Sequence, residues 1–208
     1  MIRRFGARAL IALALLAVLG ASPLVAQTKP AAAPAPVAAT PKAQAPVFLT
    51  SCGQSPGAVT VGVFLRRLQI EYDLKDTGTV KDLAAKPYKT IIIVTGSSLK
   101  GMGGAGVSID DELARAGALI AEAKKRGIQI IGAHVEGMER RAKNAAPGDN
   151  SDEMSIDAVC PKARMLIVRK DGDEDGRFTT LGKKFNVPVV FYDKSLELNT
   201  VLKNLFGK

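Results

Sequence analysis

Cys52, His134 and Glu136 are the residues of this sequence that come nearest to an enzymatic arrangement. A cysteine can act as a nucleophile, a histidine can take up its proton near neutral pH, and a nearby carboxylate can orient the histidine ring. Against this, a single histidine is often a hydrogen-bonded structural residue, and a reactive thiol needs an electropositive, partly exposed setting. A hydrolase or transferase that uses Cys52, or a serine, with His134 is therefore an alternative function. The residues leave open whether the chain is an enzyme.

A second pattern, Gly53-Gln-Ser55-Pro-Gly57, matches the G-x-S-x-G turn that presents a nucleophilic serine. The oxyanion hole of that turn uses the backbone N–H of the residue after the serine, and Pro56 has none. We therefore interpret Ser55 and Pro56 as the start of a helix, with Ser55 as the capping residue and Pro56 at the first helical position.

The glycines from Gly101 to Gly106 match the outline G-x-G-x-x-G of dinucleotide-binding loops. The match is weak, because the acidic Glu136 lies about 30 residues beyond the last glycine, where about 20 is expected. A Walker A loop is excluded, because Met102 follows GSSLKG where Lys-Ser or Lys-Thr would be needed. We expect no cofactor and no metal site.

The elements that must position these residues alternate between short apolar runs and amphipathic stretches. The apolar runs are rich in β-branched residues and are bounded by Gly, Pro or charged residues, which indicates strands buried on both faces. The expected strands are 46–51, 89–96, 128–135, 164–170 and 187–193. The expected helices are 57–72, 108–127, 151–160, 177–186 and 195–208. This alternation predicts a Rossmann-like or flavodoxin-like α/β three-layer sandwich with about five mostly parallel strands.

Ligands of such sheets bind outside the carboxyl ends of the strands, so the loops that follow the strands should share one site. These loops carry hydroxyl groups, glycine-rich turns and several cations, which suit a small anionic ligand such as a carboxylate or a phosphate. A partner protein at the same edge is the other possibility. The predicted site residues are Ser51, Gln54, Ser97, Ser98, Lys100, His134, Arg140, Arg141, Ser151 and Asp152.

The chain divides into three segments by composition. Residues 1–26 read as a secretory signal peptide, in which basic residues precede an apolar run from Ala9 to Leu19. This run is shorter than the ~18–20 residues that span a bilayer, so we expect cleavage and no integral membrane segment afterwards. Residues 27–45 form an Ala/Pro-rich disordered linker, and 46–208 form a single α/β domain. The expected location is periplasmic or secreted.

The net charge of the whole chain is higher than that of the expected folded domain. The whole chain has 29 Lys and Arg against 20 Asp and Glu, a net charge of +9, but from position 46 onward 24 basic residues face 20 acidic ones. The basic residues of that part are interspersed with acidic ones, and only 5% of residues are aromatic. Clustered cations and stacking aromatic groups are what nucleic-acid binding requires, so we expect no nucleic-acid partner.

Export would permit a disulfide between Cys52 and Cys160, but the topology disfavours it. Cys52 follows the first expected strand, whereas Cys160 precedes the fourth, so the two lie near opposite edges of the sheet. Those edges are about 16 Å apart, and a disulfide allows at most about 7 Å between Cα atoms.

Four motifs together resemble an uncharacterised family of secreted bacterial proteins, catalogued as a domain of unknown function. The motifs are Thr50-Ser51-x-Gly53-Gln54-Ser55, Gly96-Ser97-Ser98-x-Lys100-Gly101-x-Gly103, His134 with Arg140-Arg141 after five residues, and Ser151-Asp152. The resemblance covers most of the chain from Pro46 onward, and it implies export and a site built from these motifs. The family usually has a small residue such as Ala at the position of Cys52, which weighs against a cysteine enzyme.

Overall fold

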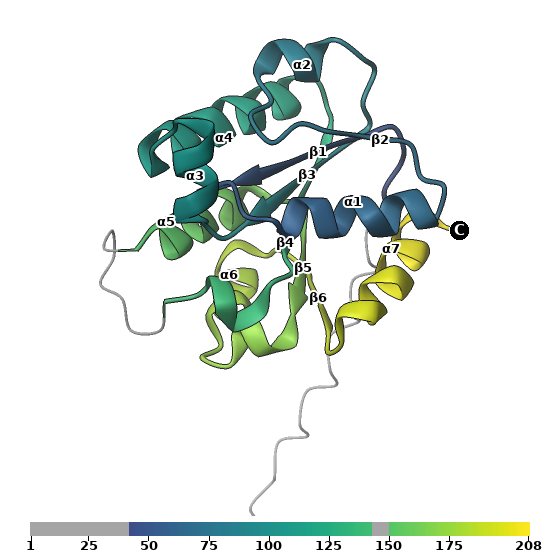
Figure 1. The fold of residues 1–208 in the computed structure, drawn as a ribbon. Coiled ribbons are helices and arrows are strands. Elements are labelled where there is room, and N and C mark those ends of the chain that lie inside the picture. Colours follow the sequence, from purple (N-terminus) through teal and green to yellow (C-terminus); the bar gives the residue numbers. More distant parts are fainter. Residues whose placement is uncertain (1–41, 143–149) are drawn as a thin grey trace, which may run out of the picture. The chain divides into compact units, whose positions relative to one another are not determined.

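The structure is a computed structural model that describes residues 42–142 and 150–208 (Figure 1). The predicted signal peptide and nearly all of the predicted linker lie outside the described residues. Within the described part, no helix has both the length and the apolar character needed to cross a bilayer.

Six parallel strands form one sheet in the order β2-β1-β3-β4-β5-β6. The strands are β1 (Val47–Cys52), β2 (Tyr72–Leu74), β3 (Thr90–Thr95), β4 (Gln129–His134), β5 (Met165–Arg169) and β6 (Val189–Tyr192). Because the chain moves outward from β1 to β2 and then returns past β1 to β3, the strand order reverses between β1 and β3. The three-layer α/β fold predicted from the sequence is confirmed.

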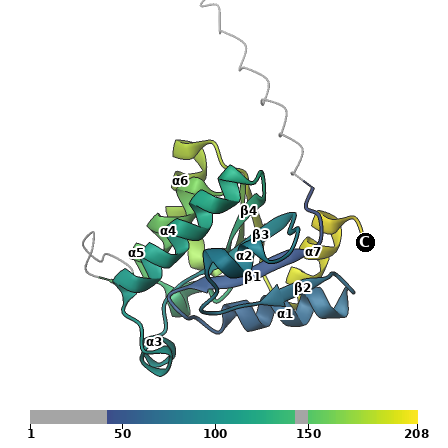
Figure 2. The same ribbon diagram turned by 90° about the horizontal axis from the view of Figure 1, so that it is seen from above.

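Helices cover both faces of this sheet, as Figures 1 and 2 show from two directions. On one face, α1 (Gly57–Arg67) and α7 (Leu198–Phe206) pack over the cluster that contains Leu49 and Ile92. The opposite face holds the cluster around Phe48 and Ile91. Its helices are α2 (Val80–Ala84), α4 (Ile109–Lys125), α5 (Ser151–Val159) and α6 (Arg177–Phe185). The remaining helix, α3 (Leu99–Ala105), projects from the domain at the edge of the sheet where β1 and β3 end (Figure 2).

Burial on both faces explains why the strands were visible in the sequence. Every residue of β1 and of β3 is buried, so each reads as a continuous run without alternation. The helix predicted at 108–127 is also confirmed as α4. Ser108 and Asp111 cap each other's backbone N–H groups there, and Lys124 and Lys125 lie in the last turn.

Three short elements were missed. The helix expected over 57–72 ends at Arg67, because Gln69 takes a left-handed φ of 54°, and β2 follows it. The capping box of Thr79 and Asp82 starts the short α2. Glycine disfavours helices, yet the glycine-rich stretch forms α3, between the capping residue Ser98 and the left-handed Gly106.

The first helix begins one residue later than expected. Pro56 is its N-cap and Gly57 its first residue, although the Ser55 hydroxyl still accepts a hydrogen bond from the Gly57 N–H at 3.2 Å. The difference is small, because Pro56 has a helical backbone conformation and its missing N–H would be unpaired in either position.

Candidate functional site

The loops that follow β1 and β3 meet at the point where the strand order reverses, which is where open α/β sheets usually bind ligands. Gln54 and Ser97 form an isolated antiparallel bridge, and the Ser98 N–H donates to the Gly53 carbonyl at 2.8 Å. Gly101 packs against the Gln54 carbonyl so closely that a Cβ there would collide with it. The two loops are therefore in direct backbone contact with each other at this point.

Ser97 connects this junction to the start of α5. Its backbone N–H donates to Asp152 Oδ1 at 2.6 Å, and its hydroxyl donates to the same oxygen at 3.1 Å. The Ser97 and Ser151 hydroxyl oxygens are 2.5 Å apart. The structure thus brings together three of the predicted site residues from two distant turns.

Ser155, one turn further along α5, joins both strand ends. Its hydroxyl donates to the Cys52 carbonyl at 2.6 Å and accepts from the Gly96 N–H at 3.0 Å. Ser155 is fully buried, so these two hydrogen bonds replace water for both backbone groups. Ser155 was not among the predicted site residues, because a serine within a helix gives no sequence signal of a contact to distant loops.

Glu136, which follows β4, links a third turn to the same network. Its carboxylate accepts hydrogen bonds from the Ser55 hydroxyl, from the Gly57 N–H at 3.1 Å and from Arg140 Nε at 3.2 Å. Arg140 Nη1 also donates to the Ser97 carbonyl at 2.9 Å. The carboxylate therefore occupies the N-terminus of α1, a position where the helix dipole and free N–H groups favour an anion.

A buried ion pair that the sequence analysis missed holds the loop after β1 from the α4 side. Glu112 is fully buried, accepts a hydrogen bond from the Gly53 N–H at 2.8 Å, and makes a two-pronged pair with Arg115 at 2.8 Å for each contact. Arg115 also donates to the Ser51 carbonyl at 2.6 Å. Burial raises the pKa of Glu112, but the hydrogen bonds from Arg115 and Gly53 outweigh burial and hold it below its ordinary value. The signal that was overlooked is a Glu and an Arg three positions apart on the face of α4 that packs against the sheet.

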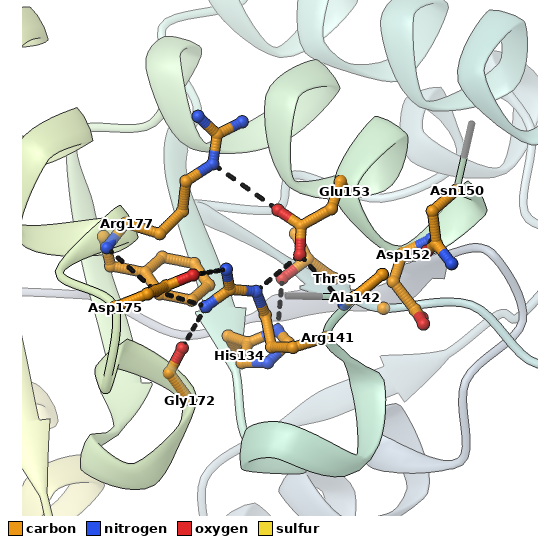
Figure 3. Close-up of polar contacts among 12 residues, drawn as sticks. Thr95, His134, Arg141, Ala142, Asn150, Asp152, Glu153, Gly172, Asp175 and Arg177 are labelled. Carbon is orange, nitrogen blue, oxygen red and sulfur yellow. Dashed lines mark hydrogen bonds and ion pairs between the residues drawn. The ribbon is translucent and has the colours of Figure 1, made fainter. Parts of the chain in front are cut away.

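Arg141 belongs to a separate cluster, which Figure 3 shows. Its side chain is buried, and the guanidinium donates to Glu153 at 2.6 Å, to Asp175 at 2.7 Å and to the Gly172 carbonyl. Its face lies 5.5 Å from the centre of the Phe178 ring. Burial lowers the pKa of Arg141, but the hydrogen bonds that it donates to the carboxylates of Asp175 and Glu153 outweigh burial and keep the group charged. Arg141 is therefore an internal structural cation, enclosed away from any ligand at the surface.

His134 lies beside that cluster and is also enclosed, with 1% of its surface exposed. Its Nε2 lies 2.9 Å from the Gly137 carbonyl, which can only accept, so Nε2 carries the proton. Nδ1, 3.1 Å from the Thr95 hydroxyl, is left to accept from it. Burial lowers the pKa of His134, and the positive Arg141 lowers it further. The neutral ring with both nitrogens bonded is a structural histidine in this arrangement.

Cys52 and His134 do not meet. Cys52 pairs with Thr95 across the strands, and His134 lies on the strand beyond Thr95, so the thiol and the ring are separated by two strand spacings, or about 9–10 Å. Cys52 is fully buried, and burial raises the pKa of its thiol to about 11. A buried, protonated thiol without an adjacent base is a poor nucleophile.

The remaining predicted residues are dispersed around the same edge. Ser51 is buried within β1, and its hydroxyl has no hydrogen-bond partner among the described residues. Gln54 donates to the Asp76 carbonyl at 2.9 Å, and Ser98 caps α3. Lys100 is exposed on α3. In the described ranges, no group of three or more His, Cys, Asp and Glu side chains is arranged to hold a metal ion.

At this edge, carboxylates of the chain itself already accept hydrogen bonds from most of the backbone N–H groups and arginines that could bind an anion. Asp173, for example, accepts from the N–H groups of Phe178 and Thr179 at the start of α6, at 2.6 and 3.2 Å. The carboxylates that fill such positions are those of Glu112, Glu136, Asp152, Glu153, Asp173 and Asp175. The described part of the carboxyl edge is consequently a network in which most cations are paired with carboxylates.

A family model described as "Domain of unknown function (DUF6305)" matches residues 44–206. The chain belongs to this family. The matched range contains all six strands and all seven helices of the DUF6305 domain described above. The resemblance to an uncharacterised family is thereby confirmed, whereas export remains a prediction. No curated protein sequence matches the chain.

Solved structures with some similarity to the DUF6305 chain include several esterases. A GDSL-like lipase from Bacteroides thetaiotaomicron VPI-5482 has 13% identity and a TM-score of 0.34, with 70% of this chain and 67% of that one covered. An acetyl xylan esterase has 8% identity and a TM-score of 0.37, with 78% and 80% covered. The psychrotrophic esterase EstA from Pseudoalteromonas sp. has 8% identity and a TM-score of 0.31, with 77% and 94% covered. Similarities this weak carry no argument about activity.

Proposed function

We propose that the protein is an exported binding domain for a small anion and that it does not transform its ligand. The observation that supports binding over hydrolysis is that each candidate nucleophile is already engaged within the fold. Cys52 is buried and protonated, and His134 has both ring nitrogens bonded. A nucleophile needs an adjacent base within hydrogen-bond reach, and neither residue supplies one to the other.

Ser55 is the remaining candidate, and its surroundings also disfavour catalysis. Its hydroxyl donates to Glu136, and that carboxylate also accepts from Arg140 and from the Gly57 N–H, so its oxygens are already engaged within the fold. Pro56 follows the serine and offers no N–H to stabilise an oxyanion.

Two observations support an anion as the ligand. From position 46 onward the chain has an excess of basic residues, 24 against 20 acidic ones. The cations at the carboxyl edge are largely paired with carboxylates, so the excess positive charge lies elsewhere on the surface. Export, and hence a periplasmic or secreted location, follows from the signal-like composition of residues 1–26.

The test combines ligand binding with an activity assay on the same protein. The purified chain is heated with inorganic phosphate, pyrophosphate, citrate and acetate, and we expect stabilisation by at least one multivalent anion. A ligand at 100 times its dissociation constant adds about 2.7 kcal/mol to the free energy of unfolding. In parallel, the chain is incubated with p-nitrophenyl acetate and p-nitrophenyl phosphate, and we expect no turnover. Turnover that Ser55→Ala or Cys52→Ala abolishes would establish a hydrolase and refute the proposal.

A further inference from the structure

A basic hollow lies at the amino edge of the sheet, opposite to the predicted site. It has a volume of about 730 Å³, within the range of small-molecule sites. Its floor includes Ile128 and Ile130 at the start of β4. The five cations that line it are Lys42, Lys89, Lys124, Lys162 and Arg164.

The charge of this basic hollow is not neutralised by the chain. No Asp or Glu is among its lining residues, and all five cations are exposed. Within the described ranges none of the five forms an ion pair with a carboxylate. At the carboxyl edge, by contrast, Arg140 and Arg141 both face carboxylates. Within the described residues, the unpaired cations that gather around one hollow are therefore those of the amino edge, while Lys100 at the carboxyl edge is a single exposed cation on α3.

Two of these cations lie at the C-terminal ends of helices, where they stabilise the helix, but others have no such role. Lys124 lies in the last turn of α4, where a cation complements the helix dipole, and Lys162 Nζ donates to the Ala158 carbonyl at 2.8 Å near the end of α5. Lys89 and Arg164 immediately precede β3 and β5 and belong to no helix. The strands β3 and β5, which flank β4, thus bring two more cations to the same hollow without a structural requirement for either charge.

We propose that the basic hollow binds a soluble anion that carries two or more phosphate groups. This inference rests on the proposed anion-binding function and assigns its site to the edge opposite to the one predicted from the sequence. Five like charges around one hollow repel one another, and a multivalent anion relieves that repulsion more than a monovalent one does. Lysine ammonium groups bind phosphate as point charges, and the guanidinium of Arg164 can bind a phosphate through two parallel hydrogen bonds. No aromatic side chain lines the hollow, so a nucleic acid would find no surface on which to stack its bases.

Isothermal titration with pyrophosphate tests the proposal on single variants. Lys89→Gln, Lys124→Gln and Arg164→Gln remove cations of the hollow, and because these side chains are exposed the fold should survive. We expect each to raise the Kd about tenfold, the loss of one charge-assisted hydrogen bond. Lys125→Gln is the matched control, since Lys125 is exposed beside Lys124 but does not line the hollow, and we expect an unchanged Kd. Lys89→Arg keeps the charge and should bind nearly as well as the wild type.

The outcomes separate this inference from the proposed function. Unchanged affinity in all three hollow variants, or a loss confined to Arg140→Gln at the carboxyl edge, would overturn the hollow and leave anion binding standing. Binding of citrate but not pyrophosphate would overturn the phosphate-bearing ligand and leave anion binding standing. Cosedimentation with vesicles of phosphatidylcholine and phosphatidylglycerol, abolished by Lys89→Gln without any response to pyrophosphate, would assign the hollow to membrane phosphates and overturn the soluble ligand. Ester turnover would refute the proposed function, while the titration would still decide the hollow.

Discussion

At the scale of single residues, burial decides which polar groups can react. Cys52 and Cys160 are free thiols buried in the same apolar cluster. Burial raises the pKa of both, to about 11 for Cys52. The thiolate is the reactive form, so a strand-end cysteine that looked like a nucleophile in the sequence is inert in its surroundings.

We therefore expect the native chain to resist a thiol reagent such as DTNB at mildly alkaline pH. Neither cysteine should react until the chain is unfolded in guanidinium chloride, after which both should react, as absorbance would show. Rapid labelling of Cys52 in the native protein would contradict this prediction and favour the cysteine-enzyme alternative. Absence of labelling after unfolding would reveal a disulfide.

His134 should make stability depend on pH in a defined direction. Burial lowers its pKa in the folded state, so below about 6.5 the unfolded chain binds the additional proton more readily than the folded one. The free energy of unfolding should fall as the pH drops through that value, by up to about 1.4 kcal/mol per pH unit, until the lower folded-state pKa is reached. Urea midpoints measured above and below this pH would show the slope. His134→Gln, which keeps one donor and one acceptor, should flatten it, and equal slopes in both proteins would contradict the prediction.

At the scale of elements, side chains from within helices hydrogen-bond to the backbone of strand ends and of the loops that follow them. Glu112 and Arg115 of α4 bind the backbone of β1 and of the loop that follows it. In the same way, Ser155 of α5 binds the ends of β1 and β3. The carboxyl edge is therefore assembled by contacts that exist only when helices and sheet have docked.

Glu112→Gln should be strongly destabilising. The substitution leaves the partly buried Arg115 without its counter-charge, and breaking a buried pair in this way removes about 3–5 kcal/mol from the free energy of unfolding. Asp110→Asn is the matched control, because Asp110 is exposed in the first turn of the same helix and contributes about 0.3–1 kcal/mol through the helix dipole.

Urea denaturation followed by circular dichroism measures both variants. A double substitution, Glu112→Gln with Arg115→Met, should recover part of the loss, because no unpaired charge remains. If Glu112→Gln were no more destabilising than Asp110→Asn, the pair would be a solvent-screened contact and the loop would not depend on it.

At the scale of the whole molecule, the sequence pattern was sufficient to predict a parallel sheet. The β-branched runs at β1, β3, β4 and β5 are almost entirely buried and therefore need no structural context to be read, whereas β6, at the edge of the sheet, is only partly buried. The same topology correctly places Ser97, Ser151 and Asp152 together. The short β2 was missed, because three half-buried residues carry too little pattern.

The charges of the two edges could not be predicted in the same way. Whether a cation is neutralised depends on partners that are distant in the sequence, such as Asp175 for Arg141. Lys89 and Arg164 look like ordinary boundaries of strands, and only the assembled sheet brings them to one hollow. Sequence patterns therefore predict where residues lie better than they predict which charges remain free.

The segment that precedes β1, residues 42–45, is bound to the rest of the fold. The described contacts begin before Pro46, the predicted start of the domain. Ala43 is buried and its N–H donates to the Leu205 carbonyl at 3.0 Å, and the Thr90 hydroxyl donates to the Gln44 carbonyl at 2.8 Å. This short segment thus connects the C-terminal helix α7 with the central strand β3.

A chain that starts at Pro46 should accordingly be less stable than one that starts at Lys42. Loss of the four hydrogen bonds that residues 42–45 make to the fold, each worth about 0.5–1.5 kcal/mol, should lower the free energy of unfolding by about 2–6 kcal/mol. The same truncation removes Lys42 and Gln44 from the wall of the basic hollow, so its affinity for pyrophosphate should fall as well. Urea titration and calorimetry of the two truncated chains measure both effects. Removal of a segment that joins α7 to β3 must lower the free energy of unfolding. Equal stability of the two truncated chains would therefore show that the segment lies on the surface without holding these elements together.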